Sequence, residues 1–367
     1  MIRKSLTTIA LAAVTAFGAS LPAQAEKPTL RVYNWSDYIA EDTVPNFTKQ
    51  TGVPVTYDVF DSNEVLEGKL LAGHTGYDVV VPSAYFLERQ IKAGVFQKLD
   101  KAMIPNFKGL DPKLMKQLAK VDPGNQYGVP YMWGTTGIGY NVKEVEKRLG
   151  KNAPTDSWKL IFDPKYVSKL KDCGVSMLDA PTDVVPAALH YLGLDPNSTN
   201  PADYEKAFAL LEKVRPYIRY FHSSQYINDL ANGNICVAIG WSGDVFQARD
   251  RADEAKHGVE IAYVIPKEGA QVWFDMLAVP ADAPHPKEAF QFINYLLSPK
   301  VEAANTNYIS YANPVPGSLK YVEKDIKDDP AIYPPPAVMD KLYTYLTPQP
   351  KINRIMTRLW TKLKTGT

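Results

Sequence analysis

Between residues 30 and 94, the spacing of apolar residues changes repeatedly from a two-residue period to a helical period. Short runs rich in valine mark the expected strands. A glycine or a capping residue marks the ends of the segments between them. The expected strands are 30–35, 53–60 and 79–81, and the expected helices are 41–50, 61–73 and 83–94. This alternation predicts a mainly parallel sheet with helices on both faces.

A second series of such segments begins after Tyr131. Its expected strands are 174–178, 235–239, 259–265 and 273–279, and its expected helices are 182–191, 204–214, 286–297 and 354–364. The chain has 367 residues, which is enough for two domains of ordinary size. We therefore predict an α/β fold with two lobes.

The charge of the chain is almost balanced, with 41 lysine and arginine residues against 40 aspartate and glutamate residues. The chain therefore lacks the excess of basic residues that would indicate a nucleic-acid-binding protein. The hydrophobic content of 45% is typical of a packed globular protein and excludes a long disordered chain.

The first 25 residues have the pattern of a secretory signal peptide. Arg3 and Lys4 precede an apolar stretch at 9–17, and Ala23-Gln24-Ala25 provides a small-x-small cleavage site. Cleavage would remove two basic residues and change the net charge from +1 to −1. No later apolar run approaches the length of a membrane span. We expect a mature chain that starts at Glu26 and is soluble in an exported compartment.

The chain has two cysteines, Cys173 and Cys236. In an oxidising compartment, an even pair of cysteines indicates one disulfide. The alternative is two buried free thiols. A disulfide that closes a loop of this length would contribute about 4 kcal/mol to stability.

Tryptophan and aspartate occur close together at three places: Trp35 with Asp37, Trp241 with Asp244, and Trp273 with Asp275. In an extended chain, residues two apart share a face, so the first and third pairs would each point an indole and a carboxylate the same way. The first two pairs follow expected strands, at the edge of an α/β sheet where ligands bind. The alternative is that each tryptophan is a core residue and each aspartate a helix cap.

An indole ring beside a carboxylate suits an organic ammonium ion. The ring attracts the cation by about 0.5–2 kcal/mol, and a carboxylate at contact distance adds roughly 4 kcal/mol before desolvation costs. Helix N-termini at the same edge repel a cation, so carboxylates are needed to reverse the local sign. Such pairs in one cleft would suit a ligand with two or more separated ammonium groups.

Enzyme motifs are weak or absent in the sequence. Gly240-Trp241-Ser242-Gly243 has its second glycine one residue too early for a nucleophile elbow, and the five histidines show no metal-ligand spacing. His222 beside Ser223 and Ser224 suggests a nucleophile with a base, but no orienting acid is evident. An exported hydrolase is one alternative, but it would need a nucleophile–base or metal constellation that the sequence does not show.

A receptor for anions or amino acids is a second alternative. Such a receptor would need arginine or lysine at the strand ends. Arg31 and Arg89 could be adjacent, but neither stands where the tryptophan–aspartate pairs do.

Several runs of the sequence resemble the periplasmic polyamine-binding proteins of ABC transporters, and most closely the putrescine-binding proteins. The similarity extends over nearly the whole mature chain. The runs that carry it are 32–39, 61–64, 77–83, 130–141, 220–224 and 235–244.

The resemblance implies a type II periplasmic binding protein fold, in which two lobes linked by two crossovers close over a ligand cleft. We assign 26–135 and 250–305 to the first α/β lobe, and 136–249 and 306–367 to the second. The resemblance also implies a monomeric periplasmic receptor that is not an enzyme, contains no metal or cofactor and does not bind nucleic acid. Such a receptor captures putrescine, spermidine or both and delivers them to an inner-membrane ABC permease.

Carried over position by position, the resemblance also implies the ligand-binding residues. Asp244 and Asp275 would hold ammonium groups, while Asp37 and Asp183 would serve the far end of the ligand or make water-bridged contacts. Putrescine binders carry glutamate in place of Asp183, whereas Tyr85 and Trp273 are more similar to the residues of spermidine binders. The full set is Trp35, Ser36, Asp37, Tyr38, Ser83, Tyr85, Asp183, Trp241, Asp244, Trp273, Asp275 and Tyr311.

Overall fold

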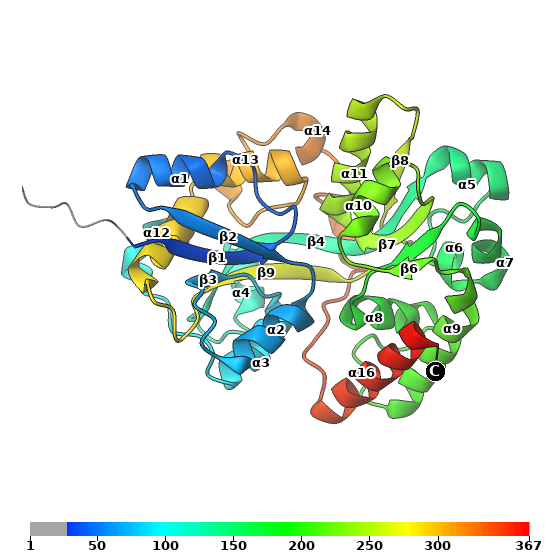
Figure 1. Cartoon of the computed structure of the whole chain (residues 1–367), viewed down its shortest axis with the longest axis horizontal. Coiled ribbons are helices and arrows are strands. Elements are labelled where there is room, and N and C mark those ends of the chain that lie inside the picture. The colour runs from blue at the N-terminus through cyan, green and yellow to red at the C-terminus, as the bar shows by residue number, and fades with distance from the viewer. Residues whose placement is uncertain (1–27, 367) are drawn as a thin grey trace, which may run out of the picture.

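The computed structural model describes residues 28–366 and shows two α/β lobes side by side (Figure 1). The signal peptide expected at 1–25 lies outside the described residues. The first lobe begins with six elements close to the predicted ranges: β1 (Leu30–Trp35), α1 (Thr43–Thr51), β2 (Val55–Phe60), α2 (Asn63–Ala72), β3 (Val79–Val80) and α3 (Ala84–Lys92). Local signals set their ends: Gly52, with φ 70°, ends α1, and the Ser62 hydroxyl caps α2 by accepting a hydrogen bond from the backbone N–H of Val65.

The longer elements that follow are α4 (Pro112–Leu118), β4 (Gly128–Asn141), α5 (Val142–Leu149), β5 (Val175–Met177), α8 (Pro181–Tyr191), α9 (Pro201–Val214), β6 (Tyr220–Phe221), α10 (Gln225–Ala231), β7 (Val237–Trp241), α11 (Ser242–Ala255), β8 (Ile261–Val264), β9 (Val272–Ala278), α12 (Pro286–Leu296), α13 (Pro299–Ile309) and α16 (Pro350–Thr365). Short helical turns, α6 (Lys159–Phe162), α7 (Pro164–Val167), α14 (Lys324–Lys327) and α15 (Pro336–Met339), lie between them.

The strands form one continuous sheet in the order β2-β1-β3-β9-β4-β7-β5-β6, with β8 paired to β4. Pairing is parallel among β1, β2 and β3 and among β5, β6 and β7, but β4 and β9 run antiparallel to all their neighbours. The expectation of a mainly parallel sheet is therefore wrong for the strands that join the lobes. Figure 1 shows β4 and β9 crossing the centre of the molecule.

Each lobe has its own hydrophobic core. The first core takes residues from 30–132 and 272–315, together with Tyr345, and the second takes residues from 138–270 and 352–363. These cores differ from the lobe boundaries that we assigned, because Ile261 packs in the second core and Tyr311 in the first. The packing therefore indicates that the chain crosses from one lobe to the other within β4 and again at the start of β9.

Residues 340–349, which we call the C-terminal strap, make a third connection between the lobes. Tyr343 forms a parallel bridge with Gln271, where the chain enters β9. Farther along, the Thr347 hydroxyl donates a 2.6 Å hydrogen bond to the carbonyl of Tyr85 in the first lobe. The strap then leads into α16, which packs on the second core. This connection adds to the two crossovers that the resemblance implied.

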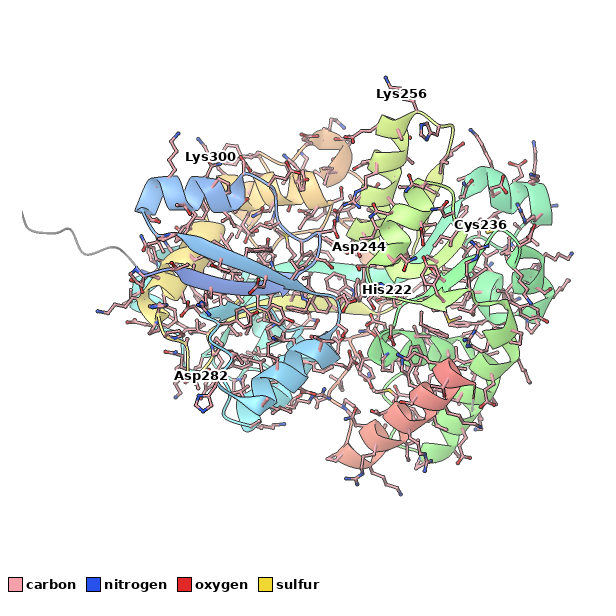
Figure 2. All side chains as sticks on the ribbon, viewed as in Figure 1. His222, Cys236, Asp244, Lys256, Asp282 and Lys300 are labelled. Atoms are coloured by element: carbon pink, nitrogen blue, oxygen red, sulfur yellow. A yellow bond between two sulfur atoms is a disulfide. The ribbon has the colours of Figure 1, made fainter. Side chains whose placement is uncertain are left out.

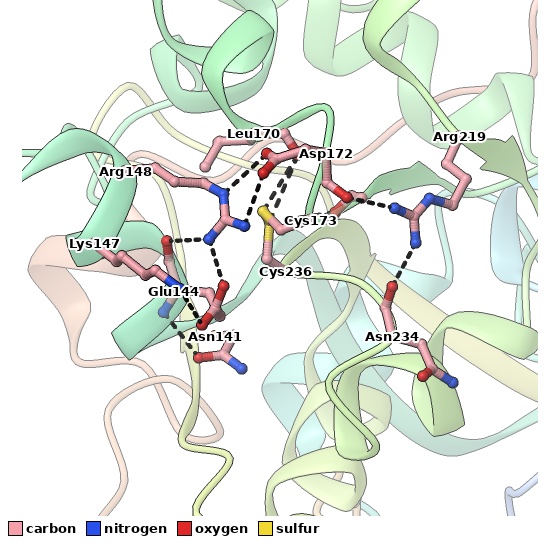
Figure 3. Close-up of a disulfide and its surroundings, with 11 residues drawn as sticks. Asn141, Glu144, Lys147, Arg148, Leu170, Asp172, Cys173, Arg219, Asn234 and Cys236 are labelled. Atoms are coloured by element: carbon pink, nitrogen blue, oxygen red, sulfur yellow. Dashed lines mark hydrogen bonds and ion pairs between the residues drawn. A yellow bond between two sulfur atoms is a disulfide. The ribbon is translucent and has the colours of Figure 1, made fainter.

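The predicted disulfide between Cys173 and Cys236 is present, with the two Cα atoms 5.5 Å apart. Figure 2 places Cys236 inside the second lobe, and Figure 3 shows its surroundings. The bond joins the ends of the paired parallel strands β5 and β7. Beside it, Arg148 pairs with Asp172 at 2.9 Å. The disulfide therefore fastens the register of two central strands.

We predict that replacing both cysteines by serine lowers the free energy of unfolding by about 4 kcal/mol, because the bond closes a loop with a sequence separation of 63. Denaturant titration of the variant and the parent measures the difference. The parent in excess reductant should unfold like the variant. A loss below about 1 kcal/mol would show that the reduced, unfolded chain is already restricted.

Candidate functional site

A cavity at the junction of the lobes contains eleven of the twelve predicted ligand-binding residues in its wall. The space between its lining atoms is about 420 Å³, part of which is open to solvent. The wall is built from the carboxyl ends of β1 and β7, the first turns of α2, α3, α8 and α11, and β9. The predicted residues in it are Trp35, Ser36, Tyr38, Ser83, Tyr85, Asp183, Trp241, Asp244, Trp273, Asp275 and Tyr311.

Asp275, on β9, is held by two hydroxyl groups of the first lobe. The Ser83 hydroxyl donates to Oδ1 at 2.6 Å, and the Tyr38 hydroxyl donates to Oδ2 at 2.8 Å. Ser83 is itself fixed by Asn63, whose amide donates to its hydroxyl and accepts from its backbone N–H, both at 3.0 Å. The carboxylate is therefore locked in orientation by neutral donors.

Asp244, in the first turn of α11, lies near the middle of the molecule (Figure 2). The Tyr311 hydroxyl donates to Oδ1 and the Tyr226 hydroxyl to Oδ2, each at 2.7 Å. The backbone N–H of Asp244 donates back to the Tyr311 oxygen at 3.1 Å. Because Tyr311 packs in the first core and α11 belongs to the second lobe, this contact joins the lobes.

Asp183, in the first turn of α8, is the third buried carboxylate of the cavity. Its Oδ1 accepts a 2.6 Å hydrogen bond from the Thr136 hydroxyl and a 3.1 Å bond from the Trp241 ring N–H. These donors are again neutral. The arrangement orients the carboxylate but leaves its charge uncancelled.

Burial raises the pKa of each of these carboxyl groups, to about 7 for Asp244 and Asp275 and to about 6 for Asp183. The charges of Asp183 and Asp244 raise the pKa of Asp275 further, while the hydroxyl donors act in the opposite direction. No lysine or arginine lies among the lining residues. The cavity thus collects negative charge and supplies no cation of its own.

Aromatic rings form the remaining walls. Trp35 meets Trp241 edge-on with ring centroids 5.4 Å apart, and the ring N–H of Trp35 donates to the carbonyl of Val81 at 2.8 Å. Tyr311 contacts both Tyr38 and Trp273. Such rings attract cations and cover methylene groups. The cavity therefore matches a ligand that combines positive charge with an apolar chain.

Two glycines permit the close packing around the cavity. A Cβ at Gly243 would lie 2.4 Å from the ring of Tyr311, and a Cβ at Gly134 would lie 2.9 Å from the ring of Trp273. Larger residues would displace these rings. The glycines thus help to place Tyr311 within reach of Asp244.

Asp37 is the predicted residue that does not line the cavity. β1 ends at Trp35, and the backbone of Asp37 has φ 54°. The Trp35 and Asp37 side chains therefore do not share a face, and the prediction that they point the same way is wrong. The Asp37 carboxylate instead accepts a 2.6 Å hydrogen bond from Arg251 of α11. This ion pair links the two lobes.

Sequence reasoning missed four residues at the site. Asn63 and Ser223 line the cavity, and Thr136 and Tyr226 hold its carboxylates. Asn63 and Ser223 stand in the recognised runs 61–64 and 220–224, so the resemblance offered a signal for both. Thr136 offered a similar signal from 130–141, whereas Tyr226 had none.

The geometry disfavours the two alternative functions. The Nδ1 atom of His222 accepts backbone N–H groups of Ser224 and Gln225 at 3.1 Å, so it is not placed as a base for Ser223. Arg89 is occupied by Glu67 at 2.5 Å and lines no part of the cavity. Over residues 28–366, no cluster of His, Cys, Asp and Glu side chains could hold a metal ion. Over the same residues, no helix combines the length and the apolar character of a bilayer span.

Comparison with known proteins identifies the relatives of the chain. The Escherichia coli (strain K12) protein named putrescine-binding periplasmic protein PotF is 60% identical over 93% of each chain. A Pseudomonas aeruginosa protein named putrescine-binding periplasmic protein SpuD is 55% identical over 95% of each chain.

A solved structure titled spermidine/putrescine ABC transporter substrate-binding protein PotD, from Streptococcus pneumoniae, superposes with a TM-score of 0.73. The two chains are 28% identical, and the match covers 92% of this chain and 99% of the solved chain. The predicted two-lobed α/β fold is therefore confirmed.

The model of a protein family, described as bacterial extracellular solute-binding protein, matches residues 42–334. This family binds solutes, which agrees with the expectation that the chain is not an enzyme. The chain belongs to the bacterial extracellular solute-binding proteins.

Proposed function

We propose that the protein is a periplasmic receptor that binds putrescine or a related polyamine between its lobes. The observation that carries the proposal is the cavity itself, in which Asp183, Asp244 and Asp275 are buried together with no cationic side chain in the wall. Buried charges are otherwise paired, so the missing partner is the ligand. The names of the two similar proteins, both putrescine-binding, support the same ligand class.

In this proposal, Asp244 and Asp275 each take an ammonium group. Their hydroxyl donors already fix the carboxylates, so little reorganisation is needed when the ligand arrives. The methylene chain lies against the rings of Trp35, Trp241 and Trp273, and each buried CH₂ contributes ~0.8 kcal/mol. No covalent step is involved.

The receptor acts outside the inner membrane and passes its ligand to an ABC permease. The signal peptide pattern at 1–25, the disulfide and the periplasmic relatives support this location. The solved relative titled as a substrate-binding protein of an ABC transporter supports the permease as partner. We propose a monomer, since closure of the two lobes of one chain completes the cavity.

The ligand range includes both putrescine and spermidine. High identity to proteins named putrescine-binding favours the diamine. Tyr85 and Trp273, by contrast, are large rings in the cavity wall that can stack on a longer chain. Asp183 supplies acidic capacity beyond the two carboxylates that a diamine needs.

Asp244→Asn and Asp275→Asn are each expected to weaken polyamine binding strongly. A buried ammonium group that loses its charged partner typically costs 2–5 kcal/mol, which corresponds to a loss of roughly 30-fold to several thousandfold. Titration calorimetry with putrescine and spermidine measures the change. Asp282→Asn, at an exposed position away from the cavity (Figure 2), is the control and should bind like the parent. Losses under tenfold in both variants would exclude these residues as the main ammonium partners.

The double variant Tyr85→Ser with Trp273→Phe is expected to lower the ratio of spermidine affinity to putrescine affinity. Loss of a stacked aromatic face is worth about 1 kcal/mol, or roughly fivefold in this ratio. Competition titrations of the variant against the parent give the ratio directly. A constant or higher ratio would show that these rings do not select ligand length.

Arg251→Gln is expected to weaken binding modestly, because it removes the ion pair with Asp37 that links the closed lobes. Both side chains are about one-third exposed, so the pair is worth at most about 1 kcal/mol, or roughly fivefold in affinity. Asp37→Asn and the double variant should show the same loss as the single variant. Additive losses in the double variant would show that the residues act separately.

A further inference from the structure

A second hollow, which we call the rear groove, lies on the opposite side of β4 and β9 from the ligand cavity. Trp133 and Phe274 are partners across these two strands, and both line the rear groove. Their neighbours Gly134 and Trp273 lie on the cavity side, where a Cβ at Gly134 would meet the Trp273 ring. Successive side chains of a strand point to opposite faces. The strands that join the lobes therefore separate the two spaces.

The rear groove has the size and composition of a small-molecule site. The centres of water molecules can reach about 320 Å³ of it. Small-molecule sites commonly enclose about 300–1,000 Å³ and have a mainly apolar lining with a few polar groups. Here the apolar lining consists of aromatic rings, prolines and aliphatic side chains. Among residues 28–366, the charged residues that line it are Asp111 and Lys113.

Three aromatic rings are grouped in this lining. The rings of Trp133 and Tyr333 are perpendicular, with centroids 6.1 Å apart. The ring of Phe274 is tilted by 38° to that of Trp133, at 6.2 Å. Trp133 and Tyr333 are half-buried, so parts of their rings remain accessible. Rings inclined to one another can present several faces to one small ligand, and ring faces attract cations.

Asp111 brings a carboxylate to the same groove. Its backbone N–H donates to the carbonyl of Pro314 at 2.9 Å, which ties the start of α4 to the loop after α13. Its Oδ1 accepts the backbone N–H of Lys113 at 2.7 Å. Lys113 is exposed, so water and salt screen its charge, whereas Asp111 is partly buried. The rings and the carboxylate together favour a cation.

The cation that suits this lining is a quaternary ammonium group. A primary ammonium group has three N–H donors that need acceptors, and the ligand cavity offers three carboxylates. Within residues 28–366, the lining of the rear groove offers one carboxylate and three rings instead. A quaternary ammonium group has no N–H donor, and aromatic rings recognise such groups through their methyl-covered charge.

We propose that the rear groove binds a quaternary ammonium compound, and that this binding is coupled to closure of the lobes. The walls of the groove are anchored on different lobes. Asp111 borders the first core, while Tyr333 packs on a small hydrophobic cluster that includes Phe246 of α11 in the second lobe. Arg249 of α11 also lies 3.9 Å from Asp329, in the segment that leads to Tyr333. Rotation of one lobe against the other therefore changes the groove.

The coupling is positive in sign. In this structure the lobes are closed, with Tyr311 bonded to Asp244 and Arg251 paired with Asp37, and the rear groove is present in the same state. A ligand that fits the groove in this form stabilises the closed lobes, as the polyamine does in the proposed function. By linkage, each ligand raises the affinity of the protein for the other by the same factor.

The test is titration of the mature chain with choline, followed by calorimetry, with and without saturating putrescine. We expect one choline per chain and a higher choline affinity when putrescine is present. The neutral isostere of choline, dimethylbutanol with carbon in place of the ammonium nitrogen, should bind roughly tenfold more weakly. Equal binding of the isostere would overturn a cation site. Displacement of choline by putrescine would place choline in the ligand cavity and would also overturn the proposal.

Variants locate the site. Trp133→Leu should weaken choline binding roughly fivefold, through loss of a ring face. Asp111→Asn should weaken it about threefold and keep the fold, since asparagine also caps a helix. Tyr321→Leu is the matched control, because this exposed tyrosine does not line the groove, and it should bind choline like the parent. Asp244→Asn should keep choline binding in the absence of putrescine.

Unchanged choline affinity in both Trp133→Leu and Asp111→Asn would overturn the site. The same choline affinity with and without bound putrescine would overturn the coupling. A parent that binds choline in the rear groove but binds no polyamine would overturn the proposed function and leave the groove in place. The two proposals therefore fail by different results.

Discussion

Asp183, Asp244 and Asp275 are buried between the lobes, and within residues 28–366 only hydroxyl and ring N–H groups donate to their carboxylates. Neutral donors orient a carboxylate but do not remove the cost of taking its charge out of water. Burial therefore raises the pKa of these carboxyl groups, and a cation beside them would stabilise their ionised form. In the proposed function, selectivity for amines follows from this imbalance.

One of these hydrogen bonds and one ion pair couple the ligand site to the arrangement of the lobes. Tyr311 belongs to the first core and orients Asp244 of the second lobe, while Arg251 of the second lobe pairs with Asp37 of the first. Separation of the lobes would remove these partners and expose the carboxylates to water. Closure thus creates the buried acidic site, and in the proposed function a bound cation compensates for the cost of burying it. The electrostatics of the ligand and the geometry of the lobes are two parts of one equilibrium.

Much of this could be predicted from the sequence because the signals are local. Valine-rich runs and glycine caps gave the elements of the first lobe, and the pairs Trp241–Asp244 and Trp273–Asp275 lie in one cavity as expected. The prediction that Trp35 and Asp37 share a face was wrong because the strand ends at Trp35 and the backbone of Asp37 has a positive φ. Residue spacing does not reveal such a turn. Strand β4 was missed because Gly134, Gly137 and Gly139 interrupt its apolar pattern. Tyr226 could not be found, since only the packing of α10 against α11 brings it to Asp244.

The position of β9 in the sheet also governs when the protein can fold. This strand lies between β3 and β4 in the first half of the sheet, yet it follows almost the whole second lobe in sequence. The hydrogen bond between Tyr38 and Asp275 spans 237 positions. A nascent chain therefore cannot add β9 to the first half of the sheet until about three-quarters of it has been synthesised, and formation of such distant contacts is intrinsically slow. Because folding is delayed, the chain can pass through a secretion channel in an extended state. It then acquires its compact form on the far side.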